Sequence, residues 1–288
     1  MAARRGPTFR RRELGKELRR LRERKGYTTK AAAEAIESSE TKLNRVESGH
    51  NQLPRVRDLE DLLELYGVTD PADREHLLML HRDSVSPDWY RPYQNYLPSG
   101  QLVYMGLESD ASAMRAWHSH FVFGLLQSES YTRALFTTAK PVHERTTDFV
   151  ESNVTLRMKR KEIAQGRAME MRVILDESAL RRVIGGPDVM REQYEEIEKL
   201  ASLDHVTVQI LPQKLATYRA SENFVLLDFD GGLEPVVMQD SPAVMTISDK
   251  ASEVWMHARK FDAMREGALA PAHTPEFLHR LAREIDET

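Results

Sequence analysis

The chain has 288 residues, of which 41% are hydrophobic and 30% charged, with a formal net charge of −4 and no cysteine. This length predicts two domains, each with enough apolar residues for a packed core. The composition excludes a disulfide framework and a thiolate metal site, and no apolar run approaches the roughly 20 residues that cross a bilayer, so we expect a cytoplasmic protein without membrane contact.

The charge is unevenly distributed along the chain. Residues 1–60 hold 16 Lys and Arg against 9 Asp and Glu, a net charge of +7, whereas the other 228 residues hold 25 against 36, a net charge of −11. A basic N-terminal part on an acidic body predicts that the N-terminal part alone meets a polyanion. In residues 1–12, arginines surround a Gly-Pro pair, which predicts an extended arm along DNA phosphates or in a minor groove. A solvated tail is the alternative for residues 1–6.

The next residues predict a small all-α domain. The leucine spacing indicates a first helix over residues 12–25, which Gly26 ends. After two short helices, a fourth is expected up to Gly67, and a fifth starts at the N-cap Asp70. The inward-facing residues of the fourth helix are expected to be Val56, Leu59, Leu62, Leu63 and Tyr66.

The two short helices form the most informative stretch. Thr28 is a good N-cap for the first of them, and Ser39 for the second, which runs to about Glu47. Leu43 and Val46 mark the buried side of the second helix. Two helices that cross steeply over a tight turn describe a helix-turn-helix. The alternative is an ordinary helix pair in an all-α domain.

The outer, N-terminal part of this second helix is the part that enters a DNA major groove. The side chains that we predict to read bases are Glu40, Thr41, Lys42 and Arg45. Arg45 suits the O6 and N7 atoms of guanine, Glu40 a cytosine amino group, and Thr41 a thymine methyl group, whereas a guanine and a phosphate both remain open for Lys42. The predicted phosphate contacts are Arg10, Arg11, Thr28, Thr29, Lys30, Ser39, Asn44, His50 and Asn51.

The remaining sequence predicts a larger α+β domain with a small mixed sheet. The DNA-binding domain is expected over residues 1–82, a linker over 83–100, and the second domain over 101–288. MRVIL and VTVQIL flank a crossover and predict two parallel strands, and ENFVLLDFD and PVVMQD predict a hairpin. The expected helices cover residues 102–119, 130–138, 145–166, 249–266 and 275–284.

No pattern of catalytic or metal-binding spacing is found in this second domain. His118 and His120 are two residues apart, which on a helix points them to different faces, so no metal site is expected. Asp176 follows an apolar strand and caps the next helix more readily than it serves as an acid or base. We therefore expect neither an enzyme nor a cofactor. The basic run over residues 157–161 leaves three interpretations open: a solvated face, a docking site for an acidic partner, and an anion pocket.

Two segments carry family resemblances. LGKELRRLRERKGYTTKAAAEAIESSETKLNRVESGHNQLP resembles the lambda-repressor-like helix-turn-helix domain of the xenobiotic-response-element family. The resemblance implies a five-helix domain in which Arg22 pairs with Glu47 and fixes the recognition helix. Glu37 stands at the turn where the family usually has Gly, which predicts a non-glycine residue with positive φ. Thr29 stands where the family often has a Gln that contacts phosphate.

The second resemblance covers most of residues 100–285. FVFGLLQSESYTRAL, ILDESALRRVIGGPDVMREQ and VTVQILP resemble the domain of unknown function that follows the helix-turn-helix in many actinobacterial regulators. This resemblance implies a regulator of development or secondary metabolism that often acts with a small partner protein.

These observations predict a sequence-specific transcriptional regulator that is cytoplasmic and associated with the nucleoid. Because one such domain reads few bases, we expect a homodimer on double-stranded DNA with a palindromic operator. A small acidic partner protein or an unknown small-molecule effector would act through the second domain. The alternatives are an antitoxin-like protein that sequesters a small partner and autoregulates its operon, and an enzyme with a DNA-targeting head.

Overall fold

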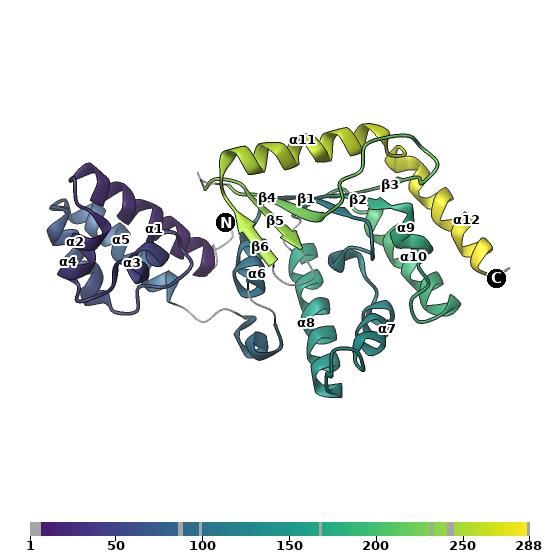
Figure 1. Cartoon of the computed structure of the whole chain (residues 1–288), viewed down its shortest axis with the longest axis horizontal. Helices are drawn as coiled ribbons and strands as arrows, with labels where there is room; N and C mark the ends of the chain where they lie inside the picture. The colour runs from purple at the N-terminus through teal and green to yellow at the C-terminus, as the bar shows by residue number, and fades with distance from the viewer. Residues whose placement is uncertain are drawn as a thin grey trace. The chain divides into compact units, whose positions relative to one another are not determined.

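The computed structural model describes residues 7–85, 89–97, 100–166, 169–230, 233–240 and 245–286. The chain divides into two compact units, one comprising Met1–Arg91 with Met105–Asp110 and the other Pro92–Tyr104 with Ala111–Thr288 (Figure 1). The domain boundaries predicted from the sequence stay predictions, and residues 86–88 and 98–99 of the expected linker lie outside the described residues. None of the described helices combines the length and apolar composition needed to cross a bilayer.

The first unit contains the predicted all-α domain. Its helices are α1 (Pro7–Arg24), α2 (Thr29–Ala35), α3 (Glu40–Glu47), α4 (Val56–Leu65) and α5 (Pro71–Ser84). The predicted N-caps are confirmed: the side chain of Thr28 accepts a hydrogen bond from the amide of Ala31, and that of Ser39 from the amide of Lys42, each at 3.2 Å. Each cap satisfies an amide at the helix start that has no partner within the helix.

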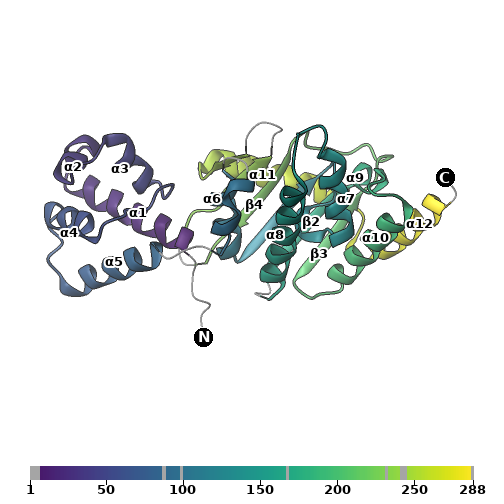
Figure 2. The same cartoon turned by 90° about the horizontal axis from the view of Figure 1, so that it is seen from below.

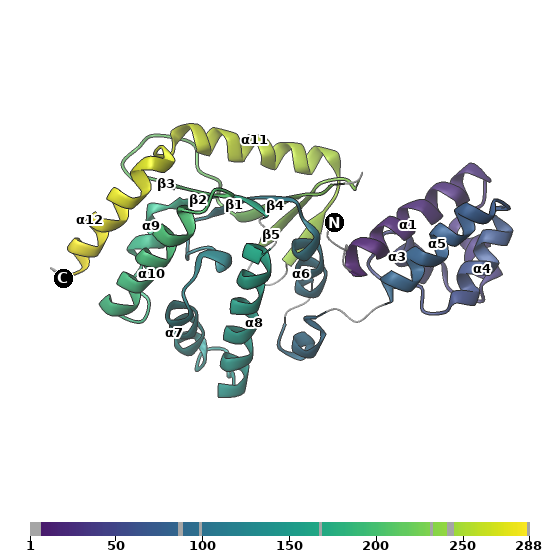
Figure 3. The ribbon, with the colours of Figure 1, turned by 180° about the vertical axis from the view of Figure 1, so that it is seen from behind.

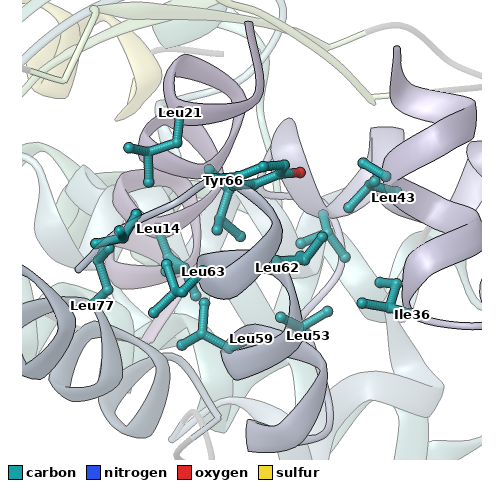
Figure 4. Close-up of a cluster of buried hydrophobic side chains, with 14 of the residues drawn as sticks. Leu14, Leu21, Ile36, Leu43, Leu53, Leu59, Leu62, Leu63, Tyr66 and Leu77 are labelled. Carbon is teal, nitrogen blue, oxygen red and sulfur yellow. The ribbon is translucent and has the colours of Figure 1, made fainter. Parts of the chain in front are cut away.

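Leucine side chains from every helix but α2 fill the core of this unit, and α2 adds Ala32, Ala33 and the adjoining Ile36 (Figure 4). Fully burying one such leucine stabilises the fold by about 1.5–3 kcal/mol relative to leaving it exposed. The predicted inward face of α4 is confirmed except at Val56, which is 48% exposed because it lies in the first turn, beyond the edge of the core.

The extended arm predicted over residues 1–12 is wrong in its second half. α1 begins at Pro7, so Arg10 and Arg11 are helical. Proline suits the first turn of a helix because its fixed φ matches the helix and its missing amide hydrogen would have had no partner there. Residues 1–6 lie outside the described residues.

In the turn between α2 and α3, Glu37 adopts the positive φ that the family resemblance predicts. Its φ is +50°, which confirms a non-glycine residue in the left-handed region. The amide of Ser38 donates to the carbonyl of Ala33 at 2.9 Å. This hydrogen bond closes the end of α2 and directs the chain into α3.

α1 and α3 approach closely at Gly15. A Cβ atom there would lie 2.4 Å from the carbonyl oxygen of Val46 and 2.7 Å from that of Glu47, and both are backbone atoms that cannot turn away. We expect Gly15→Ala to separate the two helices and lower the free energy of unfolding of this unit by about 1–3 kcal/mol, although alanine favours the helix itself. Hydrogen exchange of the α3 amides should measure this loss. Gly166→Ala, whose Cβ meets open space, is the control.

The second unit is built on a six-stranded mixed sheet among the described residues, with the order β3-β2-β1-β4-β5-β6. The strands are β1 (Ala113–His118), β2 (Glu170–Asp176), β3 (Val206–Leu211), β4 (Asn223–Asp228), β5 (Val236–Asp240) and β6 (Met245–Ser248). The predicted α+β fold with a mixed sheet is confirmed. β2 and β3 are parallel and β4 and β5 antiparallel, as predicted.

The helix predicted over residues 102–119 is wrong in its second half. α6 (Gln101–Asp110) ends eight residues before His118, and the segment that follows it is β1, a central strand that pairs with β2 on one side and β4 on the other. Its partners lie far along the chain, so the local pattern carries no sign of them. β6 was also missed from the sequence, because it has only four residues.

Helices cover both faces of this sheet. α11 (Ala251–Gly267) lies along one face, where Phe261 and Met264 pack against a cluster that includes Trp117 and Phe224. α8 (Thr147–Gly166) and α10 (Pro187–Ala201) lie on the opposite face, as the views from the front, below and behind agree (Figures 1, 2 and 3). The other helices of this unit are α7 (Glu129–Ala139), α9 (Glu177–Arg181) and α12 (Thr274–Asp286).

His118 gives this unit a pH-dependent stability. Its ring packs against Phe123 with centroids 4.9 Å apart, and among the described residues its Nε2 atom is buried without a hydrogen-bond partner. Burial, with the nearby charge of Arg157, lowers the pKa of His118 to about 3. The folded state therefore disfavours the charged imidazole, so the stability that the neutral ring supplies is present above the ordinary pKa of about 6.5 and is lost as the pH falls toward 3.

We expect the free energy of unfolding of this unit to fall by about 2 kcal/mol between pH 7 and pH 5 through His118. In His118→Phe this part of the fall should be missing, whereas the exposed His120→Phe should behave as the parent chain does. Urea unfolding at the two pH values, followed by tryptophan fluorescence, measures the difference. Equal pH dependence in all three chains would contradict the role given to His118.

Candidate nucleic-acid interface

The outer face of α3 presents all four predicted base-reading side chains to solvent. Glu40, Thr41, Lys42 and Arg45 are exposed, whereas Leu43, Val46 and Glu47 on the other side of the helix are buried. In the described part of the chain, none of the four exposed side chains forms a hydrogen bond or ion pair with the protein. They are therefore free to meet a ligand.

Arg22 of α1 and Glu47 of α3 form a buried, bidentate ion pair. Nε of Arg22 lies 2.7 Å from Oε1 of Glu47, and a second guanidinium nitrogen lies 2.8 Å from Oε2. The third nitrogen donates to the carbonyl of Tyr27 at 2.9 Å, just before the N-cap of α2. The hydrogen bonds to Glu47 raise the pKa of Arg22. One guanidinium thus connects α1 with the ends of both helices of the helix-turn-helix.

Tyr66 completes the buried surroundings of this pair. The side chain is fully buried, and in the described structure its hydroxyl has no hydrogen-bond partner (Figure 4). Burial and the nearby carboxylate of Glu47 raise the pKa of Tyr66, so the hydroxyl stays neutral. The aromatic ring packs against Tyr27, with centroids 6.3 Å apart.

The predicted phosphate contacts occupy different settings. Lys30 and Asn44 are exposed, and the N-cap hydroxyls of Thr28 and Ser39 lie at the starts of α2 and α3. His50 is exposed, with its Nδ1 atom 2.8 Å from the hydroxyl of Ser48.

Thr29 and Asn51 are half-buried, and the amide of Asn51 donates to the carbonyl of Arg45 at 3.0 Å. Arg10 pairs with Glu13 at 2.9 Å and with Asp83 at 3.7 Å, so a phosphate would have to displace two carboxylates there. Arg11 lies beside it in α1, half-buried, with partners inside the protein.

Sequence reasoning missed the close backbone approaches at two glycines that place α3, although Gly49 is recognisable as the end of that helix. Gly15 allows the carbonyls of Val46 and Glu47 to approach α1, and Gly49, with φ +72°, brings the chain against Arg12. The Leu-Gly pair in α1 was the available signal, because glycine inside a helix costs stability and so indicates a close packing contact.

The polar groups of the second unit largely satisfy one another. Asp176 caps α9, and its carboxylate accepts from the amide of Ser178 at 2.9 Å, as predicted. Lys161 is buried, pairs with Glu196 and donates to the carbonyl of Gln127 at 2.9 Å. The interpretation of residues 157–161 as a solvated face is therefore wrong at Lys161, and also at Arg160, which is buried too. Among the described residues, no group of three or more His, Asp or Glu side chains could hold a metal ion.

Comparison with known families agrees with both resemblances. Residues 13–77 match the model of a helix-turn-helix domain, and residues 101–280 match that of a domain of unknown function, DUF5753. No curated protein matches the chain. The helix-turn-helix domain indicates DNA binding and transcriptional regulation. Because the second match covers more than half of the sequence, the chain belongs to the family defined by the DUF5753 domain, here preceded by a helix-turn-helix domain.

Proposed function

We propose that the protein is a sequence-specific transcriptional regulator that reads DNA with the outer face of α3. The observation that carries this proposal is the exposure of Glu40, Thr41, Lys42 and Arg45 on a helix held from behind by Leu43 and the Arg22–Glu47 pair. Arg45 would bind guanine O6 and N7, Glu40 a cytosine amino group, and Thr41 a thymine methyl group.

The phosphate contacts would set the register of this helix. The residues that we assign to them are Thr28, Thr29, Lys30, Ser39, Asn44, His50 and Asn51. Along the sequence these residues lie before, within and after α3: Lys30 belongs to α2, Asn44 to α3, and His50 follows the end of α3. Such contacts hold a reading helix in place without distinguishing one base from another.

We further propose that two copies bind a palindromic operator. A single small module buries a limited surface and discriminates few base pairs, so a dimer with half-sites about one turn of DNA apart, roughly 34 Å, supplies the missing specificity. The DUF5753 domain would carry the dimer contact and receive the signal, from a small partner protein or a small molecule.

Selection of bound fragments from a random DNA pool tests this function. The intact protein is expected to enrich one motif made of two inverted half-sites. The same selection with cell extract added should change the yield or the motif if a modulator acts. Recovery of fragments without any shared sequence would contradict the proposal, because binding would then rest on phosphate contacts alone.

A further inference from the structure

The outer face of α11 carries an unusual group of exposed apolar side chains. Trp255 is 61% exposed and Met256 44%, and Tyr218, from the segment between β3 and β4, is 46% exposed. Together with Arg259, Lys260 and Ala263 they line a shallow pocket of about 270 Å³. Contiguous apolar side chains at the surface of a folded domain mark an interaction site more often than scattered ones do.

This surface lies on a rigid support. α11 lies along the sheet (Figure 3). His257, Phe261 and Met264 are its buried side chains, and Phe261 and Met264 belong to the core cluster on that face of the sheet. Nδ1 of His257 lies 2.7 Å from the carbonyl oxygen of Glu253, four residues earlier in α11, and this contact fixes the orientation of the imidazole ring. The exposed side chains are thus presented by a helix that cannot turn them inward.

Arg259 gives the lining of the pocket a positive charge. The guanidinium of Arg259 lies 4.8 Å from the centroid of the Trp255 ring, a cation–π contact, and among the described residues it has no carboxylate partner. Lys260 is neutralised by Glu222. No carboxylate lines the pocket, although the chain beyond residue 60 has a net charge of −11. Arg259 is therefore a local positive charge on an acidic domain.

These features favour one kind of occupant. The pocket is smaller than the roughly 300–1,000 Å³ typical of small-molecule sites and leaves Trp255 open to solvent. Across a two-fold axis the patch of a second copy would meet this patch, and the pocket lining of that copy offers Arg259 no carboxylate. An amphipathic helix with apolar anchors and carboxylates beside them matches both the pocket and the charge.

We propose that the outer face of α11 binds an acidic amphipathic helix of a partner protein. One apolar side chain of the partner enters the pocket between Tyr218, Trp255 and Met256, and a neighbouring carboxylate pairs with Arg259. This proposal assigns a binding surface to the partner-dependent regulation proposed above, and it rests on that function. It makes no assumption about which DNA sequence α3 reads.

The test uses the intact chain and two labelled synthetic peptides. Each forms an amphipathic helix with the same leucine face, and the polar face is glutamate in one peptide and lysine in the other. Fluorescence anisotropy should show the glutamate peptide binding about tenfold more tightly. Trp255→Ala should weaken both peptides, and Arg259→Glu should reverse the preference. Arg265→Glu, the same charge change on the same helix outside the pocket, should leave the preference in place.

Two results would overturn this proposal. One is that Arg265→Glu shifts the preference as far as Arg259→Glu does, since general charge would then explain the binding. The other is that sedimentation shows a dimer that Trp255→Ala dissociates, which would make the patch a contact between copies. The DNA-reading proposal is tested separately, by DNA binding of Arg45→Ala, a change that lies outside the peptide site. Either proposal can therefore fail while the other stands.

Discussion

Arg22→Met is expected to lower the free energy of unfolding of the helical unit by about 3–5 kcal/mol. The change leaves the carboxylate of Glu47, 6% exposed, inside the protein without its cation. It also removes the donor to the carbonyl of Tyr27 at the entrance to α2. A buried charge that loses its partner costs far more than the net value of the pair, because its desolvation is no longer compensated.

Hydrogen exchange at the amides of α1 to α4 measures this loss without interference from the second unit. The matched control is Arg19→Met, which removes an exposed arginine paired with Glu23 at 2.8 Å and should cost little stability, because solvent screens an exposed ion pair. The double variant Arg22→Met with Glu47→Leu should recover much of the loss, since no buried charge remains. If Arg22→Met were as stable as Arg19→Met, the Arg22–Glu47 pair would not be what holds α3 against α1.

Arg45→Ala is expected to weaken binding to the preferred operator by about 1–3 kcal/mol and to relax the requirement at one base position. A bidentate contact from arginine to guanine supplies discrimination of that size. The side chain is exposed and forms no hydrogen bond or ion pair with the residues that the structure describes, so its removal should leave the fold intact. Fluorescence anisotropy with operators altered at one base pair at a time gives both the loss and the position.

Lys30→Ala is the companion measurement for this prediction. A phosphate contact carries no sequence information, so this change should weaken all DNA sequences similarly and lower the slope of affinity against salt by about one. If Arg45→Ala bound the preferred operator unchanged, or lost affinity equally for every sequence, the reading face assigned to α3 would be wrong.

The helical unit could be predicted well because its signals are local. The N-caps Thr28 and Ser39 and the inward leucines lie within a few residues of the structure that they determine. The turn at Glu37 was expected from the family resemblance instead. The exposed face of α3 follows from the same spacing, since burying Leu43 leaves the positions beside it outside.

The rest depends on distances between segments far apart in the sequence. The segment of β1 was predicted as a helix because its hydrogen-bond partners, β2 and β4, follow about 50 to 110 residues later along the chain. The contact of Gly15 with the end of α3 is a separation between two helices, which no periodicity encodes. The patch on α11 depends on which side of that helix the sheet covers, so Trp255 could equally have been a core residue.

Site-directed crosslinking tests the central claim most directly. A photoreactive amino acid placed at Thr41, on the outer face of α3, should crosslink to bound DNA, and the same group at Glu64, exposed on α4, should not. Crosslinks from position 64 alone, or from neither position while DNA stays bound, would show that another surface meets the duplex.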